Sequence, residues 1–309
     1  MEYVNCDLCG GNETTLLFEE KDRLHKIPGT FHLVRCDQCG LIYLNPRPTK
    51  EEMKRYYPAE YRPYVRAIND ENSLLVRLDR LYGINKRCRA IVTRVGESGR
   101  LLDIGCATGN FLDGMRRHGR WDLYGVEVNQ EAVMYARQRL GLNVFIGEVN
   151  QAAFPHRYFD VVTSWDVLEH LHEPTRTLLE VRRITKPGGL LVISLPNPDS
   201  FDARLFGRYW AGLDAPRHLF VFSPAILRKL LHKTGFLIVE IKTFTGGYHP
   251  FALSLRFWLD EKVRDGRAKD ALLRCINSVA PRLLLLPYFI LANRLNTTSV
   301  MTVFARRQE

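Results

Sequence analysis

The sequence has no uninterrupted apolar stretch of the roughly 18 residues that a membrane-spanning helix requires. Its first residues, MEYVNCDLCGG, also lack the basic and then apolar pattern of a secretory signal. We therefore expect neither an integral membrane protein nor a secreted one, and predict a cytoplasmic protein. With 46% hydrophobic and 25% charged residues, the 309-residue chain has the composition of a globular protein with one substantial α/β domain and a smaller module.

Long runs of like charge are absent as well, since no five consecutive residues are all basic or all acidic. Such runs are typical of nucleic-acid-binding tails, so we do not expect a nucleic-acid partner. The net charge is +10, and residues 196–309 carry 17 basic and 9 acidic side chains, which is +8 of that total. Three interpretations stay open: a solvated basic surface, an anionic small-molecule substrate, or contact with an anionic membrane surface.

Four of the seven cysteines form two identical patterns, Cys6-x-x-Cys9 and Cys36-x-x-Cys39, and each pattern is followed by glycine. Two thiolates separated by two residues can bind one metal ion from a tight turn, and glycine allows the left-handed conformation that ends the turn. In a chain without a secretion signal, these pairs predict zinc rather than disulfides. Four thiolates leave no open coordination position, so we predict a structural zinc in a small zinc-ribbon-like module.

Residues 100 to 195 alternate between apolar, strand-like runs and helical segments, which predicts a parallel sheet built from βαβ units. A capped helix follows, with Ser223 as its N-cap, Pro224 in its first turn and Gly235 after its end. Two further strands are predicted at 236–244 and 299–305. The expected strands of the first group are 101–104, 123–126, 143–146, 160–163 and 190–195.

The turn after the first of these strands, in LLDIGCATG, carries candidate ligand-binding residues. Gly105 and Gly109 let backbone N–H groups approach a ligand, and Asp103 is placed to hydrogen-bond an amine. The next strand ends in Glu127, where a carboxylate can face ribose hydroxyls. The dinucleotide spacing G-x-G-x-x-G is absent, because Gly105 is followed by Ala107 and then by Gly109, and this argues against a nicotinamide enzyme.

Together these motifs resemble those of class I S-adenosylmethionine-dependent methyltransferases. The pattern D-x-G-x-x-x-G, with an acidic residue ending the second strand, is similar to the cofactor-binding motif of that family. The resemblance implies an α/β fold with a seven-stranded Rossmann-like sheet whose last strand is antiparallel. It covers residues 85–240, with further matches at Gly147-Glu148, Phe159-Asp-Val-Val162, Trp165-Asp-Val-Leu-Glu-His170 and Lys186-Pro-Gly-Gly189.

The resemblance also implies roles for individual residues in binding S-adenosylmethionine. Ala107 departs from the family pattern, which has glycine there, and its methyl group is expected to shift the loop slightly from the methionine moiety. The implied contacts are the methionine end with Asp103, Gly105, Ala107 and Gly109; the ribose hydroxyls with Glu127, next to Val128; the adenine with Glu148 and Val149; and the far side of the cofactor with Trp165 and Asp166.

The N-terminal part is similar to a methyltransferase subfamily that carries a zinc module ahead of the catalytic domain. The similarity rests on the two cysteine patterns and on the segments NPRP and YYP, and the subfamily includes sugar C-methyltransferases and enzymes of cell-surface polysaccharide pathways. We predict a zinc-binding module at 1–48, a helical connector covering the cofactor site at 49–98 and a methyltransferase domain at 99–309. Within that domain, 245–298 is predicted to be a helical insertion or lid, with peripheral contact at the inner membrane face as the open alternative.

Methyl transfer often needs a base for the acceptor proton, and two histidines are candidates. His218 follows the predicted fifth strand, and its surroundings, DAPRHLFVFS, match a segment that supplies the catalytic histidine of sugar C-methyltransferases. Asp214 or Arg217 can orient its ring or bind an acceptor phosphate. His170 ends the Asp-x-x-Glu-His turn after the fourth strand and faces the same side of the sheet. For each histidine, a purely structural hydrogen bond is the alternative role.

The sequence favours methyl transfer from S-adenosylmethionine to a small anionic acceptor, namely a sugar nucleotide or a lipid- or phosphate-linked glycan intermediate. An RNA base methyltransferase is an alternative, although SWDV stands where amino-directed nucleic-acid enzymes have Asn/Asp-Pro-Pro-Tyr/Phe. A quinone-like O-methyltransferase is another, because Asp166, Glu169 and His170 resemble the magnesium-binding set of ubiquinone-pathway enzymes. A non-catalytic protein that keeps the fold as a binding scaffold is the third.

Overall fold

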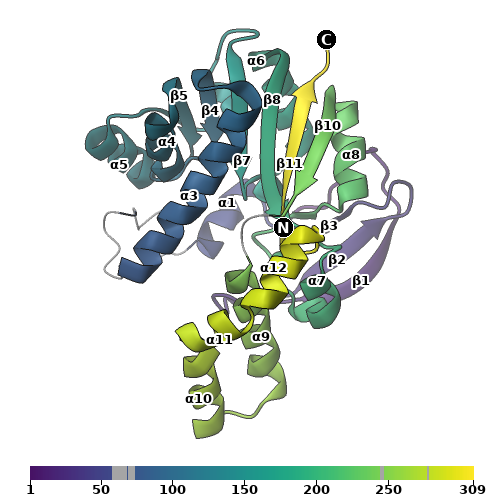
Figure 1. Ribbon diagram of the computed structural model, residues 1–309. Coiled ribbons are helices and arrows are strands. Elements are labelled where there is room, and N and C mark those ends of the chain that lie inside the picture. Colours follow the sequence, from purple (N-terminus) through teal and green to yellow (C-terminus); the bar gives the residue numbers. More distant parts are fainter. Residues whose placement is uncertain (58–67, 69–73, 244–246, 277) are drawn as a thin grey trace.

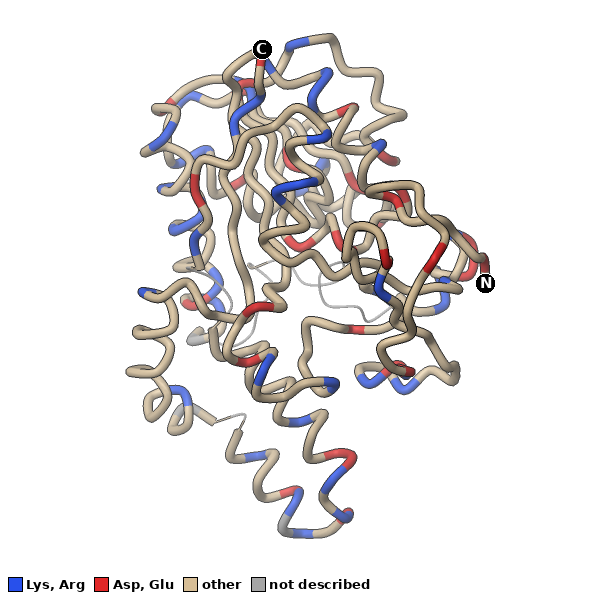
Figure 2. The backbone as a smooth tube through the Cα atoms, turned by 90° about the vertical axis from the view of Figure 1, so that its right-hand side faces the viewer, with Lys and Arg blue, Asp and Glu red and all other residues tan. Residues whose placement is uncertain are grey.

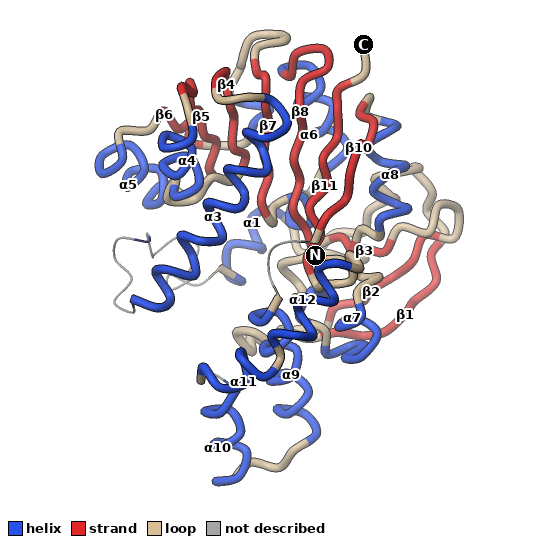
Figure 3. Tube along the Cα trace, viewed as in Figure 1, coloured by secondary structure: helices blue, strands red, loops and turns tan. Residues whose placement is uncertain are grey.

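The computed structural model describes residues 1–57, 68, 74–243, 247–276 and 278–309. The described residues form two β-sheets, one of seven strands and one of four. Figure 1 shows the large sheet with helices on both faces and the small sheet beside the edge where its parallel strands end. Figure 3 shows the two sheets as separate groups of strands. The arrangement of the small sheet against this edge decides where the candidate site lies.

The large sheet consists of β4 Ser98–Ile104, β5 Arg120–Glu127, β6 Asn143–Ile146, β7 Phe159–Trp165, β8 Thr185–Pro196, β10 Phe236–Lys242 and β11 Val300–Arg307. Its strand order is β10-β11-β8-β7-β4-β5-β6. Neighbouring strands from β8 to β6 are parallel, whereas β11 is antiparallel to both β8 and β10. The predicted seven-stranded sheet with a reversed last strand is therefore confirmed.

Helices cover both faces of this sheet because successive strand residues point to opposite sides. On one face lie α3 (Leu74–Val95), α4 (Asn110–Met115) and α5 (Gln130–Leu140), and on the other lie α6 (Pro174–Ile184) and α8 (Pro224–Lys233). Leu101 of β4 packs in the core under α3, α4 and α5, whereas the next residue, Leu102, packs in the core under α6 and α8. The near-continuous apolar runs of the sequence thus reflect strands that are buried on both faces.

The predicted capped helix is α8, and its ends form as the sequence indicates. The Ser223 side chain accepts a hydrogen bond from the Ile226 N–H, and Pro224 occupies the first turn. Gly235 follows with φ of +81°, a conformation that favours glycine. The capping residues therefore place the start of β10 correctly for its pairing with β11.

The small sheet joins the N-terminal module to the methyltransferase domain. It consists of β1 Thr14–Glu20, β2 Phe31–Cys36, β3 Ile42–Leu44 and β9 Phe220–Val221, all antiparallel to their neighbours in that order. The first three strands come from the predicted module, and the fourth comes from the loop that carries His218. The boundary predicted at residue 48 therefore divides the sequence but does not divide the sheet.

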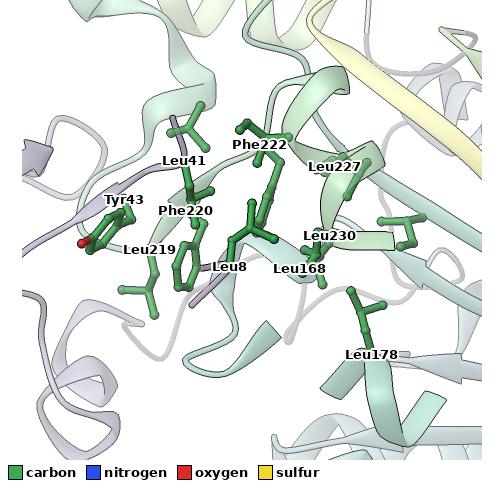
Figure 4. Close-up of a cluster of buried hydrophobic side chains, with 14 of the residues drawn as sticks. Leu8, Leu41, Tyr43, Leu168, Leu178, Leu219, Phe220, Phe222, Leu227 and Leu230 are labelled. Atoms are coloured by element: carbon green, nitrogen blue, oxygen red, sulfur yellow. The ribbon is translucent and has the colours of Figure 1, made fainter. Parts of the chain in front are cut away.

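The same two parts share one hydrophobic core, which Figure 4 shows. Tyr43 of β3 stacks on Phe220 of β9 with 6.2 Å between ring centroids, and Phe220 stacks in turn on Phe222. Burying one leucine or phenylalanine contributes about 1.5–3 kcal/mol, so this shared core holds the module firmly to the domain. The labelled members of the cluster are Leu8, Leu41, Tyr43, Leu168, Leu178, Leu219, Phe220, Phe222, Leu227 and Leu230.

The connector contains α1 (Lys50–Met53), the short 3-10 helix η1 (Lys54–Tyr56) and α3, while residues 58–67 and 69–73 of it lie outside the described residues. Another short helix, α7, follows β8 at Phe201–Phe206. Between β10 and β11 the described residues form four helices, which we call the helical arm: α9 Tyr248–Lys262, α10 Arg267–Ile276, α11 Val279–Leu284 and α12 Leu286–Arg294. Among the described helices, none has the length and apolar character needed to cross a bilayer.

Candidate functional site

The four predicted metal ligands, Cys6, Cys9, Cys36 and Cys39, come together, with all their sulfur atoms within 4.8 Å of one another. The Cys6 and Cys39 sulfurs are 3.4 Å apart and those of Cys9 and Cys36 are 3.5 Å apart, too far for disulfide bonds. A tetrahedral zinc with Zn–S bonds of about 2.3 Å places its sulfur ligands about 3.8 Å apart. This donor set therefore fits a zinc ion with a closed coordination shell.

The two cysteine turns have the same backbone geometry. The Gly10 N–H donates to the Cys6 carbonyl at 2.8 Å, and the Gly40 N–H donates to the Cys36 carbonyl at 2.9 Å. Gly10 and Gly40 have φ of +80° and +85°, which explains the glycine after each pair. Although burial opposes ionisation of Cys36, hydrogen bonds from the turn's backbone lower its pKa to about 7. A lowered pKa favours the thiolate that a metal ion requires, whereas burial raises the pKa of Cys6 and of Cys39.

The glycine loop, residues 105–109, connects β4 to α4 and has three residues with positive φ. Gly105 and Gly109 have φ of +70° and +80°, and Ala107 has +47°. A Cβ atom added to Gly105 would lie 2.5 Å from Val167, and one added to Gly109 would lie 2.4 Å from Leu142. The neighbouring side chains of Val167 and Leu142 thus favour glycine at both positions, whether or not a ligand is bound. Ala107 adopts a conformation that costs a non-glycine residue about 1–2 kcal/mol, which explains why glycine is usual at this position.

Glu127, at the end of β5, connects the glycine loop to the start of α5. Its side chain is buried, and its two carboxylate oxygens accept hydrogen bonds from the Ala107 N–H at 2.9 Å and the Asn129 N–H at 2.8 Å. Burial raises the pKa of Glu127, and these backbone hydrogen bonds oppose the change. Each oxygen keeps a lone pair, so the carboxylate can still accept hydrogen bonds from hydroxyl groups.

Asp103 lies deeper than the sequence suggested. Its side chain is 2% exposed, and its carboxylate accepts a hydrogen bond of 2.6 Å from the Thr163 hydroxyl of the adjacent strand β7. Burial raises the pKa of Asp103 to about 7, although Thr163 acts in the opposite direction. The structure thus places Asp103 between two strands, directly below the glycine loop, and not at an open surface.

Val128, predicted next to the ribose, and Glu148 and Val149, predicted beside the adenine, have three different environments. Val128 is 60% exposed and follows Glu127 at the sheet edge, whereas Val149 is buried in the core. The carboxylate of Glu148 lies 2.6 Å from the Lys50 ammonium of α1. Of these three residues, only Val128 offers an apolar surface to a ligand.

Trp165 and Asp166, at the end of β7, are held by a residue that the sequence analysis missed. Arg87 of α3 places its guanidinium 4.6 Å from the Trp165 ring centre and 3.6 Å from the Asp166 carboxylate. Trp165 packs edge-to-face on Phe111, and Asp166 accepts a hydrogen bond from the Ser194 hydroxyl at 2.9 Å. A basic residue in the middle of a helix has no local sequence signal, so Arg87 could be found only from the fold.

The connector contacts the predicted cofactor site at three separate points. Besides Lys50 and Arg87, the Ile68 N–H donates to the Asn110 side-chain oxygen at 3.1 Å, at the start of α4. These contacts lie at the two sides and the middle of the loop-bearing edge. They are the arrangement expected of a segment that covers a bound cofactor.

The two candidate bases, His170 and His218, lie together, and the turn that ends in His170 begins beside the glycine loop. Their ring centroids are 4.6 Å apart and the ring planes are inclined by 76°. The Val167 side chain packs against Gly105 and leaves no room there for a Cβ atom. Val167 also begins the turn that ends in His170, because the His170 N–H donates to the Val167 carbonyl at 2.9 Å. Residues from two separate loops therefore meet beside the predicted methionine end of the cofactor site.

The hydrogen bonds of the two rings define their neutral tautomers. Nδ1 of His218 lies 2.8 Å from the Gly212 carbonyl, and Nδ1 of His170 lies 2.9 Å from the Arg217 carbonyl. A carbonyl oxygen only accepts, so Nδ1 carries the proton and Nε2 keeps its lone pair. Burial, and then the neighbouring His218 ring, lower the pKa of His170 to about 3. His170 is therefore a weak base near neutral pH, and His218 is the better candidate.

Glu169 lies between the two histidines and was considered in the sequence only as a magnesium ligand. Its side chain is 1% exposed, and within the described part of the chain neither carboxylate oxygen has a hydrogen-bond partner. Burial, with a contribution from Asp166, raises the pKa of Glu169 well above its usual value. One of its oxygens is 4.0 Å from His218 Nε2. The raised pKa favours the neutral acid form of Glu169 while His218 is neutral, and a positive charge on the His218 ring would favour the carboxylate.

The magnesium set suggested by the sequence does not come together. Among the described residues, it is Glu169, His170 and His218 whose potential ligand atoms lie within 4.8 Å of one another, and Asp166 is not in that group. The Asp166 carboxylate instead faces Ser194 and Arg87. Magnesium prefers oxygen ligands in octahedral geometry, so two imidazoles and one carboxylate do not fit it.

Arg217 holds the loop that carries His218. Its guanidinium is fully buried, 2.8 Å from the Asp22 carboxylate and 2.6 Å from the Asp214 carboxylate. It also donates to the Tyr56 carbonyl at 3.3 Å. One side chain thus connects the β1–β2 loop of the module, the connector and the candidate catalytic loop. Because two carboxylates already occupy the guanidinium, Arg217 is not placed to bind an acceptor phosphate.

We expect the purified protein to contain about one zinc ion per chain, because the four thiols form a closed tetrahedral set. Elemental analysis of metal content should show this ratio. Cys39→Ser should lower the zinc content and the free energy of unfolding, whereas Cys275→Ser, at an exposed cysteine outside the cluster, should change neither. Full stability of the wild-type protein in chelator, without bound zinc, would contradict the assignment.

Arg217→Met should lower the free energy of unfolding by about 3–5 kcal/mol, because it leaves two buried carboxylates without their cation. Urea unfolding measures this change. The control is Arg176→Met, which removes an exposed ion pair with Glu173 on α6 and should cost no more than about 0.5 kcal/mol. Equal stability of the two variants would show that the buried cluster does not hold the structure together.

Comparison with known proteins identifies the family. The family model described as a methyltransferase domain matches residues 80–241, more than half of the chain. A ubiquinone biosynthesis O-methyltransferase from Cereibacter sphaeroides is 32% identical over 154 residues, covering 46% of this chain and 62% of that protein. Another, from Aeromonas salmonicida, is 28% identical over 177 residues, covering 53% and 72%. An uncharacterized methyltransferase from Schizosaccharomyces pombe is 32% identical over 108 residues, covering 31% and 39%. The chain therefore spans less than two thirds of two of these three relatives.

Solved structures are similar in fold over a larger part of the chain. A magnesium protoporphyrin IX methyltransferase from Synechocystis aligns with a TM-score of 0.53 and 16% identity, covering 84% of this chain and 100% of that one. A SAM-dependent methyltransferase from Archaeoglobus fulgidus aligns with a TM-score of 0.50 and 22% identity, covering 76% and 98%. The protein has the class I S-adenosylmethionine-dependent methyltransferase fold and belongs to the methyltransferase-domain family.

Proposed function

We propose that this protein transfers a methyl group from S-adenosylmethionine to a small anionic acceptor, either a sugar nucleotide or a lipid- or phosphate-linked glycan intermediate. The observation that carries the proposal is the adjacency of two groups of residues. The glycine loop with Glu127 forms the first group, and the buried pair of Glu169 and His218 forms the second. Val167 contacts the first group and begins the turn that carries Glu169.

The glycine loop and Glu127 would hold S-adenosylmethionine, whose sulfonium supplies the electrophilic methyl group. Glu127 retains lone pairs for the ribose hydroxyls, and Val128 exposes apolar surface next to it. Arg87 adds a positive charge beside Trp165 and is suited to a carboxylate of the methionine moiety. The connector would exclude water from the cofactor, which strengthens each of these polar contacts.

His218 would act as the general base. Its Nε2 lone pair would accept the acceptor proton as the new bond to the methyl group forms, while Nδ1–H stays bonded to the Gly212 carbonyl. The resulting imidazolium would lie 4.0 Å from the Glu169 carboxylate, which stabilises the positive charge. His170 would keep the His218 ring in position by edge-to-face packing and would stay neutral.

The charge around the catalytic loop supports an anionic acceptor. Lys21, Arg23 and Arg208 line a small cavity together with Glu20 and Asp214, so three basic and two acidic side chains meet there. Lys21 and Arg208 also form ion pairs with Glu261 and Glu20. Residues 196–309 have a charge of +8, which comes from 17 basic and 9 acidic side chains. A phosphate or pyrophosphate group would be attracted to this side of the molecule.

A quinone-like acceptor is the second candidate, favoured by the similarity to ubiquinone biosynthesis O-methyltransferases. The proposed base would equally accept a proton from a phenolic hydroxyl. Incubation with S-adenosyl[methyl-³H]methionine separates the two candidates. Label in nucleotide sugars or phosphorylated glycans supports the first, and label only in catechol-type quinone precursors supports the second.

Replacing Glu127 with alanine should weaken the binding of S-adenosylhomocysteine by about 1.5–3 kcal/mol, the range for hydrogen bonds to a charged group. The carboxylate would be lost both to the ribose and to the glycine loop that it holds in place. Isothermal titration calorimetry measures this effect. Glu131→Ala, at an exposed glutamate in the first turn of α5, is the control and should bind S-adenosylhomocysteine like the wild type. If both variants bind like the wild type, the ribose lies elsewhere.

His218→Ala should reduce turnover by about 10²–10⁴, the usual contribution of a positioned base, and leave the affinity for S-adenosylhomocysteine unchanged. Label transfer and calorimetry measure the two quantities. His232→Ala, at an exposed histidine of α8, should retain wild-type turnover. Full turnover of His218→Ala would eliminate the role. Loss of both turnover and cofactor binding would show that His218 is needed only to hold its loop.

A further inference from the structure

The last part of the helical arm presents an apolar face to solvent. α11 and α12 form a nearly continuous helical run, because the Leu285 N–H donates to the Pro281 carbonyl and the Phe289 N–H donates to the Leu285 carbonyl. Large apolar residues recur along this run, and several of them are three or four residues apart, which is the spacing of one helical face. They are between 46% and 80% exposed: Leu283, Leu284, Leu286, Ile290, Leu291 and Leu295.

The opposite side of the same run already packs against the domain. Phe289 and Ala292 are buried, and the Tyr288 hydroxyl donates to the buried Asp202 carboxylate at 2.6 Å. Asp202 also accepts a hydrogen bond from the Ser299 hydroxyl at the start of β11. This anchoring fixes which side of the helix faces outward. The exposed leucines are therefore a second apolar face and not the inward face of an unpacked helix.

The apolar surface continues onto the neighbouring helix α7. Phe201 contacts the Tyr288 ring, with 5.9 Å between the ring centroids. Phe201 is 51% exposed and Leu205 is 56% exposed. Figure 1 shows α7 beside α12, at the edge of the molecule where β8 ends. We call the combined surface of α7, α11 and α12 the apolar patch.

The charged side chains of α11 and α12 are all positive, whereas the exposed Asp199 precedes α7. Residues 271–308 contain no aspartate or glutamate, and exposed arginines stand at 204 on α7 and at 274, 282 and 294 on the arm. In Figure 2 the helical arm, at the bottom of the molecule, has both basic and acidic positions, and its acidic residues all precede residue 271. Exposed leucines flanked by arginine are the composition of helices that lie in the interface of an anionic bilayer. A contact between two copies of this chain would bring like charges together.

We propose that the apolar patch docks on a membrane surface containing anionic phospholipid. The leucines of α11 and α12 would enter the boundary between headgroups and acyl chains, and the arginines would contact lipid phosphates. The run lies along the surface and does not cross the bilayer. This docking would hold the carboxyl edge of the large sheet, with His218, near the membrane. It does not depend on which acceptor is methylated.

Vesicle sedimentation with the full-length protein tests the proposal. The protein should bind mixed vesicles, made of phosphatidylglycerol and phosphatidylcholine in equal proportion. It should bind vesicles of phosphatidylcholine alone at least about tenfold more weakly. The double variant Leu284→Glu/Leu291→Glu should lose at least about tenfold in affinity for the mixed vesicles. Leu179→Glu, at a leucine of α6 that is 50% exposed outside the patch, is the matched control and should bind like the wild type.

Calorimetric binding of S-adenosylhomocysteine by each variant shows that the fold and the cofactor site are intact, so a failure of docking is distinct from a failure of the methyltransferase assignment. Equal vesicle binding by the double variant and the wild type would overturn the proposal, as would no binding by the wild type. A wild-type dimer in analytical ultracentrifugation that the double variant abolishes, without vesicle binding, would assign the patch to a second copy instead.

Discussion

The buried charge of Arg217 is the constraint on which the arrangement of this molecule depends. Among the described residues, Arg217 has the largest fully buried side chain, and a guanidinium removed from water is stable only next to compensating anions. Asp22 comes from the cysteine module and Asp214 from the loop that carries His218. The buried positive charge of Arg217 is therefore fully compensated only when the module and the loop are both in place. The module and the loop that carries His218 are thus parts of one packed structure.

A continuous hydrogen-bonded path leads from the cysteine cluster to the candidate base. The second cysteine turn lies between β2 and β3, and β3 pairs with β9. The Leu44 N–H donates to the Leu219 carbonyl, and the Leu219 N–H donates to the Glu169 carbonyl. A metal that fixes the two turns thus fixes the strand next to His218 and the backbone of Glu169. Zinc with four protein ligands would act on methyl transfer through position and not through chemistry at the metal.

Much of the fold could be predicted because its signals are local. The strands of the large sheet are buried apolar runs bounded by turns, and the ends of α8 are defined by Ser223, Pro224 and Gly235 within a short segment. The cysteine turns are equally local, since Cys-x-x-Cys-Gly requires one backbone conformation whatever surrounds it. The loop of glycines after β4 belongs to the same class. In each case the residues that determine the structure are neighbours in the sequence.

The chemistry of the candidate site depends instead on partners that are distant in the sequence, and this is why it was only partly predictable. Asp22 and Arg217 are 195 residues apart, and no pattern around either one indicates the other. Arg87 resembles the other basic residues of α3 until the fold brings it over Trp165. Glu169 was noticed for its place beside His170, but its burial without a hydrogen-bond partner depends on how two loops meet. That burial gives Glu169 its significance, because a buried carboxylate without a hydrogen-bond partner is costly to keep charged. Under the proposed mechanism, a proton gained by His218 would place a compensating positive charge 4.0 Å away.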